Sequence, residues 1–137
     1  MRGDVFIDSN VWLYAFVAGE RIKNIKAKRL IEENKSKICI STQVINEVSR
    51  NLLKKCDVSE GFITDFINDA YLKFQVLSPS KDSLLNASRI REEYAFSYWD
   101  SLIISSALES GCSMLYSEDM QHGQVIDKFL TIKNPFK

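Results

Sequence analysis

The sequence predicts an α/β fold, in which a mostly parallel central sheet of about four to five strands lies between layers of helices in a three-layer sandwich. Short apolar runs of strand length alternate along the chain with longer segments whose apolar residues repeat at helical spacing. This alternation implies right-handed crossovers between parallel strands, with helices on both faces of the sheet. The 137 residues suffice for one core and are too few for two, and no linker or internal repeat is present. We therefore expect a single domain over residues 1–137.

The strands are expected where a short apolar run ends at a polar or turn residue. The first run, residues 5–7, ends at Asp8, and the third, residues 74–78, is stopped by Pro79. The expected strands cover residues 5–7, 37–41, 74–78 and 113–116, with a last edge strand from the segment 129–136.

The helices are expected where apolar residues recur every three or four positions behind a residue that can cap the first turn. Ser9 with Asn10, Thr42 and Ser80 offer such caps, and Gly111 ends the last helix. The expected helices cover residues 11–16, 21–34, 42–55, 59–74, 80–94 and 98–110.

The composition is that of a soluble globular protein, with 45% apolar and 26% charged residues. The longest apolar run, residues 11–18, is too short to cross a bilayer, and the N-terminus lacks the pattern of a signal peptide. We therefore expect a cytoplasmic protein without a membrane partner. Cys39, Cys56 and Cys112 lie in apolar surroundings without CxxC spacing, and with only His122 to join them they are interpreted as reduced core residues rather than a zinc site.

The basic residues are concentrated in one third of the chain although the formal net charge is zero. Residues 21–55 contain ten Lys or Arg and three Glu, so their balance is plus seven and the remainder carries minus seven. Such a chain can present a positive surface beside an acidic pocket, which would suit a nucleic acid. The alternative is that these residues are only the solvated faces of two helices.

One acid is placed by helical spacing on a face that should be buried. Asp100 lies three, four and seven residues before Ile103, Ile104 and Ala107. A buried carboxylate needs a cation or several hydrogen-bond donors to remain charged. Two interpretations are open: Asp100 caps its own helix, or it forms one wall of a metal site.

Four acids are expected to converge at one edge of the sheet. Asp8 ends the first strand and Asp119 follows the fourth, while Glu47 and Asp100 belong to helices that begin near the same edge. A Glu in a helix is usually solvated, so we assign Glu47 to the site only because the other three acids are expected nearby. Carboxylates gathered in one crevice repel each other unless cations bind there. All-oxygen ligands favour Mg²⁺ or Mn²⁺, and such a site supports phosphodiester hydrolysis by a metal-activated water.

Four segments, VFIDSNVWLYAF, STQVINEVSRNLL, YWDSLIISSALESGC and LYSEDMQHGQVID, together resemble the PIN-domain ribonucleases, and most closely the VapC-type toxins of toxin–antitoxin systems. The resemblance extends from Val5 to the closing NPF. It implies a catalytic and metal-binding quartet of acids, with hydroxyl and amide side chains that support them. The quartet is Asp8, Glu47, Asp100 and Asp119, and the supporting residues are Asn10 and Ser117.

Two further polar residues fall within the last of these segments. His122 belongs to the resemblance, and we interpret it as ordering its loop rather than as a general base, because a metal-bound water needs none. We interpret Glu118 as an exposed neighbour rather than a ligand, because Asp119 is the residue that matches the motif.

The resemblance implies an endoribonuclease that uses Mg²⁺ or Mn²⁺ and cuts transfer RNA or ribosomal RNA, leaving 5′-phosphate and 3′-hydroxyl ends. It also implies a homodimer and a VapB-type antitoxin that inserts a helix or an extended tail into a hydrophobic groove. The apolar stripe from Phe62 to Phe74 is core, or core plus part of that groove. Our candidates for contacts to the RNA backbone are Lys23, Lys26, Lys28, Arg29, Arg50, Lys54 and Lys55.

Two other classes of protein share parts of this pattern. A haloacid-dehalogenase-like phosphatase needs a second Asp two residues after Asp8, where this chain has Asn10. A receiver-like regulatory module, which binds a metal or a partner without turnover, needs paired acids at the first strand and a phosphoacceptor after the third. The third strand here is followed by Ser78, Pro79 and Ser80.

Overall fold

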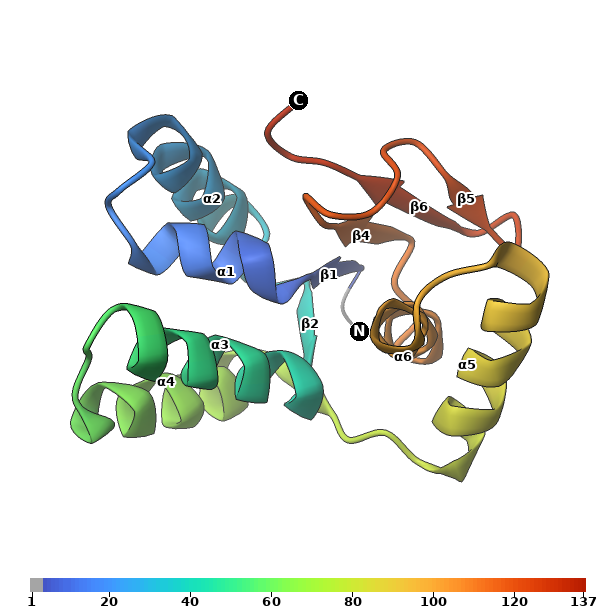
Figure 1. The fold of residues 1–137 in the computed structure, drawn as a ribbon, viewed down its shortest axis with the longest axis horizontal. Coiled ribbons are helices and arrows are strands. Elements are labelled where there is room, and N and C mark those ends of the chain that lie inside the picture. The colour runs from blue at the N-terminus through green and yellow to red at the C-terminus, as the bar shows by residue number, and fades with distance from the viewer. Residues whose placement is uncertain (1–3) are drawn as a thin grey trace.

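The computed structural model describes residues 4–137, in which a sheet of six strands is flanked by six helices (Figure 1). The predicted α/β sandwich is confirmed, with one strand more than the upper expected number. The strands are β1 Val5–Ile7, β2 Ile38–Ser41, β3 Gln75–Leu77, β4 Met114–Tyr116, β5 Val125–Ile126 and β6 Leu130–Lys133. The helices are α1 Ser9–Phe16, α2 Arg21–Glu33, α3 Thr42–Lys55, α4 Glu60–Lys73, α5 Lys81–Tyr94 and α6 Tyr98–Glu109.

The strand order in the sheet is β3-β2-β1-β4-β6-β5, and only β5 runs antiparallel to its neighbour. The expectation that the last strand lies at an edge is wrong, because β6 pairs with β4 on one side and with β5 on the other. Strand β5 has only two residues inside a polar loop, so no apolar run marks it in the sequence. In Figure 1, α1 to α4 lie on one side of β1 and β2, and α5 and α6 lie on the other.

Two strands run directly into the helices that follow them, and this moves the predicted caps by one residue. The N-cap of α1 is Asp8 rather than Ser9 or Asn10, and the N-cap of α3 is Ser41 rather than Thr42. Asp8 accepts the backbone N–H of Ser9 and Ser41 accepts the backbone N–H of Val44, so in both cases the polar residue after the last apolar residue of the strand satisfies a free N–H in the first turn of the helix, because no loop separates the two elements.

The caps of α5 and α6 decide the role of the acid on α6. Ser80 caps α5 as predicted and forms a reciprocal capping box with Ser83. Helix α6 is capped by Ser97, whose Oγ accepts the Asp100 backbone N–H at 3.2 Å. Asp100 is therefore not the cap of its own helix, and its carboxylate is free to serve elsewhere. Gly111 follows α6 with φ 77°, in the left-handed region that glycine adopts without strain.

The core lies between the sheet and the inner faces of the helices. Ile103, Ile104 and Ala107 of α6 are buried, as their spacing with Asp100 predicts. The wide stripe on α4 divides into two parts, because Phe62 and Tyr71 remain exposed while other residues of the stripe pack into the core. The buried part of the stripe consists of Ile63, Phe66 and Ala70. None of the helices within residues 4–137 is long and apolar enough to cross a membrane.

Candidate active site

The first strand delivers Asp8 to the centre of the carboxyl edge of the sheet. Its backbone N–H donates to the carbonyl of Tyr116 at 2.9 Å, which joins the ends of β1 and β4. One carboxylate oxygen accepts the Ser9 backbone N–H at 2.7 Å, and the other accepts the Ser117 hydroxyl at 2.9 Å. The side chain is only 6% exposed. Asp8 is therefore fixed in one orientation by donors on both of its oxygens.

Asn10 connects the start of α1 to the loop that follows β4. Its Nδ2 donates to Asp119 Oδ2 at 3.1 Å and to Ser117 Oγ at 3.4 Å, while its Oδ1 accepts the Glu118 backbone N–H at 3.2 Å. The two residues predicted to support the acids, Asn10 and Ser117, thus lie in contact with Asp119 and Asp8. At the position where a phosphatase of the dehalogenase type needs an Asp, the chain uses an amide to hold an acid.

The remaining two acids approach Asp8 from separate helices. Glu47 lies on α3 and Asp100 in the first turn of α6, and both are half-buried. Gln43, one turn before Glu47, donates from Nε2 to Glu47 Oε2 and to the Trp99 carbonyl, each at 3.4 Å. This amide connects the two helices that carry the acids. Asp119 is the most exposed of the four acids.

The electrostatics show that the four acids act on one another. Burial raises the pKa of Asp8 from 3.8 to about 6; the hydrogen bonds from Ser117 and Ser9 lower this pKa, and the charges of Glu47 and Asp100 raise it. Burial also raises the pKa of Asp100; the hydrogen bond from Ser97 opposes this shift and the charge of Asp119 adds to it. These charges link the four acids into one cluster, because Glu47 and Asp100 raise the pKa of Asp8 and Asp119 raises the pKa of Asp100.

The cluster has the oxygen donors of a divalent-metal site without being a closed ligand shell. Within residues 4–137, no three His, Cys, Asp or Glu side chains come together closely enough to hold an ion as they stand. Carboxylates that repel each other are expected to stay apart until a cation neutralises them. A buried carboxylate fixed by two donors and flanked by further acids suits a hard ion such as Mg²⁺, which accepts few protein ligands and retains several waters. The residues present therefore fit such an ion.

Lys23, one of the candidate contacts to RNA, makes several contacts within the fold. It forms an ion pair with Glu118, and its Nζ lies 4.9 Å from the centroid of the Tyr14 ring. Tyr14 donates its hydroxyl to Glu118 Oε1 at 2.8 Å. Hydrogen bonds from Lys23 and Tyr14 hold the pKa of Glu118 below its usual value, against the effect of burial. The interpretation of Glu118 as an exposed bystander is thus wrong: it is half-buried and anchors the loop next to Asp119 to α1 and α2.

The other basic residues proposed to contact RNA are exposed on two helices. Lys26, Lys28 and Arg29 belong to α2, and Arg50, Lys54 and Lys55 belong to α3. Among them, Lys55 lines a cavity of about 450 Å³ together with Asn10 and Asp119. That cavity connects the basic end of α3 with the acids.

His122 lies on the surface in the loop after the acids. Its Nδ1 accepts the backbone N–H of Asn134 at 3.0 Å, which ties this loop to the segment after β6. The contact supports the interpretation of His122 as a residue that orders the loop.

The class of this domain is defined by a mostly parallel α/β sandwich whose acids lie directly after β1, in the loop after β4 and on the helices α3 and α6. A family model described as the PIN domain matches residues 5–127, and the chain belongs to this family. The resemblance found in the sequence is confirmed at the level of the family. A search of curated proteins finds no match.

Several solved structures share the fold. A toxin–antitoxin complex from Klebsiella pneumoniae superimposes with a TM-score of 0.71 at 19% identity, over 96% of this chain and 98% of that chain. VapC20 from Mycobacterium tuberculosis, described as a Sarcin-Ricin loop cleaving toxin, gives 0.67 at 18% identity, over 82% and 87%. DNA-bound VapBC from Salmonella typhimurium gives 0.69 at 17% identity, over 97% and 98%. At these identities the similarity establishes the fold.

Proposed function

We propose that this protein is a Mg²⁺- or Mn²⁺-dependent endoribonuclease and the toxin of a VapBC-type toxin–antitoxin pair. The observation that carries the proposal is the arrangement around Asp8: a buried carboxylate with a raised pKa, fixed by Ser9 and Ser117 and coupled to Glu47 and Asp100. Such a cluster is unfavourable for folding, and a bound cation would offset the repulsion between its carboxylates. Structural neighbours described as toxins and as a Sarcin-Ricin loop cleaving toxin support the proposed substrate class.

In this mechanism the carboxylates hold the metal ion, and they repel RNA when the ion is absent. Asp8, Glu47, Asp100 and Asp119 would hold the ion, and Asn10 and Ser117 keep Asp119 and Asp8 oriented toward it. Without counter-charge, the same acids repel a phosphodiester, so RNA cannot approach the empty cluster closely. When bound, the ion supplies positive charge for the phosphate and lowers the pKa of a water. The four acids, held in place by Asn10 and Ser117, would thus determine where the ion binds and therefore which phosphate of the RNA lies next to it.

The experiment is cleavage of total cellular RNA by the purified protein with Mg²⁺ or Mn²⁺, with an EDTA control and mapping of the product ends. We expect a few cuts that leave 5′-phosphate and 3′-hydroxyl ends and that are lost with EDTA and in Asp8→Asn. Asp57→Asn is the matched control, because Asp57 is exposed and has φ 54°, a conformation that Asn also adopts. Products with 2′,3′-cyclic phosphate would show a different chemistry and refute the proposal.

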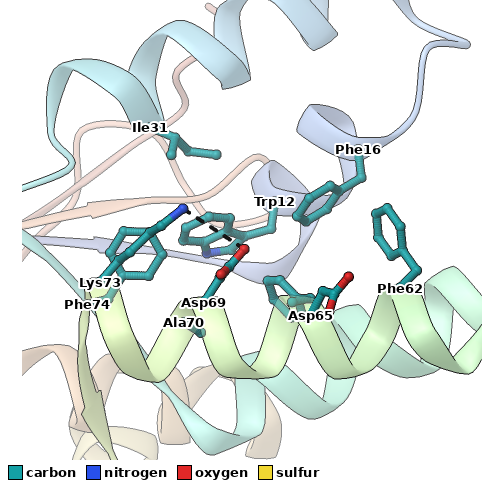
Figure 2. A pocket seen from close by; sticks show the side chains of 10 residues that line it. Trp12, Phe16, Ile31, Phe62, Asp65, Asp69, Ala70, Lys73 and Phe74 are labelled. Carbon is teal, nitrogen blue, oxygen red and sulfur yellow. Dashed lines mark ion pairs between the residues drawn. The ribbon is translucent and has the colours of Figure 1, made fainter.

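The antitoxin is proposed to occupy an apolar cavity of about 350 Å³ between α1, α2 and α4. Figure 2 shows the rings of Phe16 and Phe62 facing each other, with Ile31 above α4 and Asp65 and Asp69 along it. The two rings pack edge to face with centroids 5.7 Å apart. Lys73 lines the same cavity and pairs with Asp69 at 3.9 Å, so Asp65 is the acid that would meet a basic side chain on a segment that also carries apolar residues. Phe62 is not needed for packing of the core, and in this proposal it contacts the antitoxin.

Co-expression with the neighbouring gene tests this part of the proposal. Phe62→Glu should leave RNA cleavage intact while the growth arrest is no longer relieved by the antitoxin. Tyr71→Glu is the control, because Tyr71 is also exposed on α4 and lies outside the cavity. Equal relief of both variants would place the antitoxin elsewhere. The proposed homodimer is tested separately by light scattering of the purified protein.

A further inference from the structure

A third cavity lies between the start of α3 and the start of α6. It has a volume of about 570 Å³ and includes Glu47 in its wall. Pockets of this size accommodate small organic groups in other proteins. Because Glu47 belongs both to this cavity and to the acidic cluster, a ligand in the cavity lies next to the proposed reaction centre.

The cavity presents two exposed aromatic rings. Trp99 is 62% exposed and Tyr98 is 51% exposed, and their rings pack edge to face with centroids 5.0 Å apart. The guanidinium of Arg91 lies 4.6 Å from the centroid of the Tyr98 ring, and the Trp99 carbonyl accepts the hydrogen bond from Gln43. The backbone and the neighbouring ring are therefore anchored, while most of the Trp99 side chain remains exposed. Trp99 directly precedes Asp100 in the chain.

Polar groups accompany the rings. Gln43 and Asn46 line the same cavity. The Nε2 of Gln43 already donates to Glu47 and to the Trp99 carbonyl, so Gln43 offers its Oε1 as an acceptor, while the side-chain amide of Asn46 offers both donors and an acceptor. The polar edge of a nucleobase also combines donors and acceptors, and proteins that bind unpaired bases combine such side chains with aromatic stacking.

We propose that this cavity binds an unpaired nucleobase of the substrate beside the scissile phosphate, with the base stacked on Trp99 and its polar edge against Gln43 and Asn46. The inference rests on the proposed ribonuclease function and deepens it by naming what the enzyme recognises. A base is the part of RNA that suits this place, because it is uncharged and can approach Glu47 without the repulsion that a phosphate meets. The competing occupant, a second copy of the chain, is an outcome of the test.

The test measures binding of fluorescein-labelled single-stranded oligoadenylate and of a matched abasic oligonucleotide, with Mg²⁺, in an Asp8→Asn background that leaves the RNA uncut. Four proteins are compared: this background alone and the same background with Trp99→Phe, Trp99→Leu or Tyr71→Leu. Phe retains a stacking face and Leu retains only apolar volume. Tyr71→Leu removes another exposed aromatic residue that lies outside the cavity.

We expect the background protein, the Phe variant and the Tyr71 variant to bind oligoadenylate roughly tenfold more tightly than the abasic strand. The Leu variant should bind both strands equally. A base preference that survives in Trp99→Leu overturns the proposal, as does a failure of all proteins to bind oligoadenylate. A Trp99→Leu variant whose mass by light scattering falls to that of a smaller oligomer, with its base preference unchanged, assigns the face to an interface between copies and also overturns it.

The outcome is separable from that of the proposed function. Cleavage of RNA without base preference refutes the nucleobase site alone. Base preference in a protein that cuts no RNA refutes the nuclease and leaves the recognition site standing.

Discussion

Removal of the charge from Asp8 should stabilise the fold while it abolishes activity. The pKa of this carboxyl is raised from 3.8 to about 6, chiefly by burial. Between these two pH values the folded protein holds a proton that the unfolded chain has already lost, so stability falls as the pH rises through this window. At about 1.4 kcal/mol for each pKa unit, the folded state at neutral pH carries a penalty of about 3 kcal/mol.

Asp8→Asn is the appropriate change, because Asn retains the shape and both hydrogen bonds. Its Oδ1 can accept the Ser9 backbone N–H, and its Nδ2 can donate to the Ser117 hydroxyl, which now accepts instead of donating. Asn is also as good an N-cap as Asp for α1. The variant should therefore recover a large part of the penalty, roughly 1 to 3 kcal/mol.

Urea unfolding without divalent ions measures this effect. We expect Asp8→Asn to be more stable than the wild type at about pH 7 and nearly equal to it at about pH 4, where the wild-type carboxyl is protonated in the folded state. Added Mg²⁺ should stabilise the wild type more than the variant, because a ligand stabilises the state that binds it and the variant has lost one of the four acids that would hold the ion. A variant that is less stable at pH 7, or whose gain does not change with pH, would refute the reasoning.

Three further predictions concern the residues around the acids. Lys55→Glu should weaken RNA binding and reduce the slope of log affinity against log salt by about 0.7. Lys35→Glu, which changes an exposed residue away from the cavity, should leave this slope unchanged. Equal slopes for both variants would show that Lys55 is only solvated. Lys23→Met should leave the salt slope unchanged and lower the thermal midpoint, and this loss should shrink when Glu118→Gln is also present; additive losses in that double-mutant cycle would deny the coupling. Asn10→Ala should reduce the cleavage rate about 10- to 100-fold without weakening RNA binding, because it frees Asp119; an unchanged rate would remove Asn10 from the site.

The elements whose signal is local are those that the sequence predicted well. Strands β1 and β2 follow buried apolar runs, β3 and β4 follow runs that are only partly buried, and α5 begins after a Ser that the sequence marks as a cap. Errors arose where neighbours in space decide the structure. The two-residue β5 exists because β6 offers it a partner, and the cap of α1 passes to Asp8 because the strand leads into the helix without a loop.

The site shows the same division. The approach of the four acids to one another was predictable, because the topology of a parallel sheet brings the ends of its strands and the helices that follow them together, and their common catalytic role stays a prediction. The pairing of Lys23 with Glu118 was not predictable, because 95 positions separate the two residues and nothing in the sequence around a lysine indicates which acid it pairs with. The aromatic pair next to Asp100 was likewise passed over, since ring exposure depends on how α6 packs against α5 and α3.

The central claim is that four acids from distant parts of the chain act as one nucleolytic site. The most direct measurement is the rate of RNA cleavage with Mg²⁺ by four single variants, Asp8→Asn, Glu47→Gln, Asp100→Asn and Asp119→Asn. Two control variants, Asp57→Asn and Glu92→Gln, remove exposed acids at other positions. Loss of a residue that only supports a metal ligand costs about 10- to 100-fold, so loss of each ligand should cost at least as much. We predict losses of roughly a hundredfold or more in all four variants and unchanged rates in both controls. Wild-type cleavage by any of the four would contradict the account.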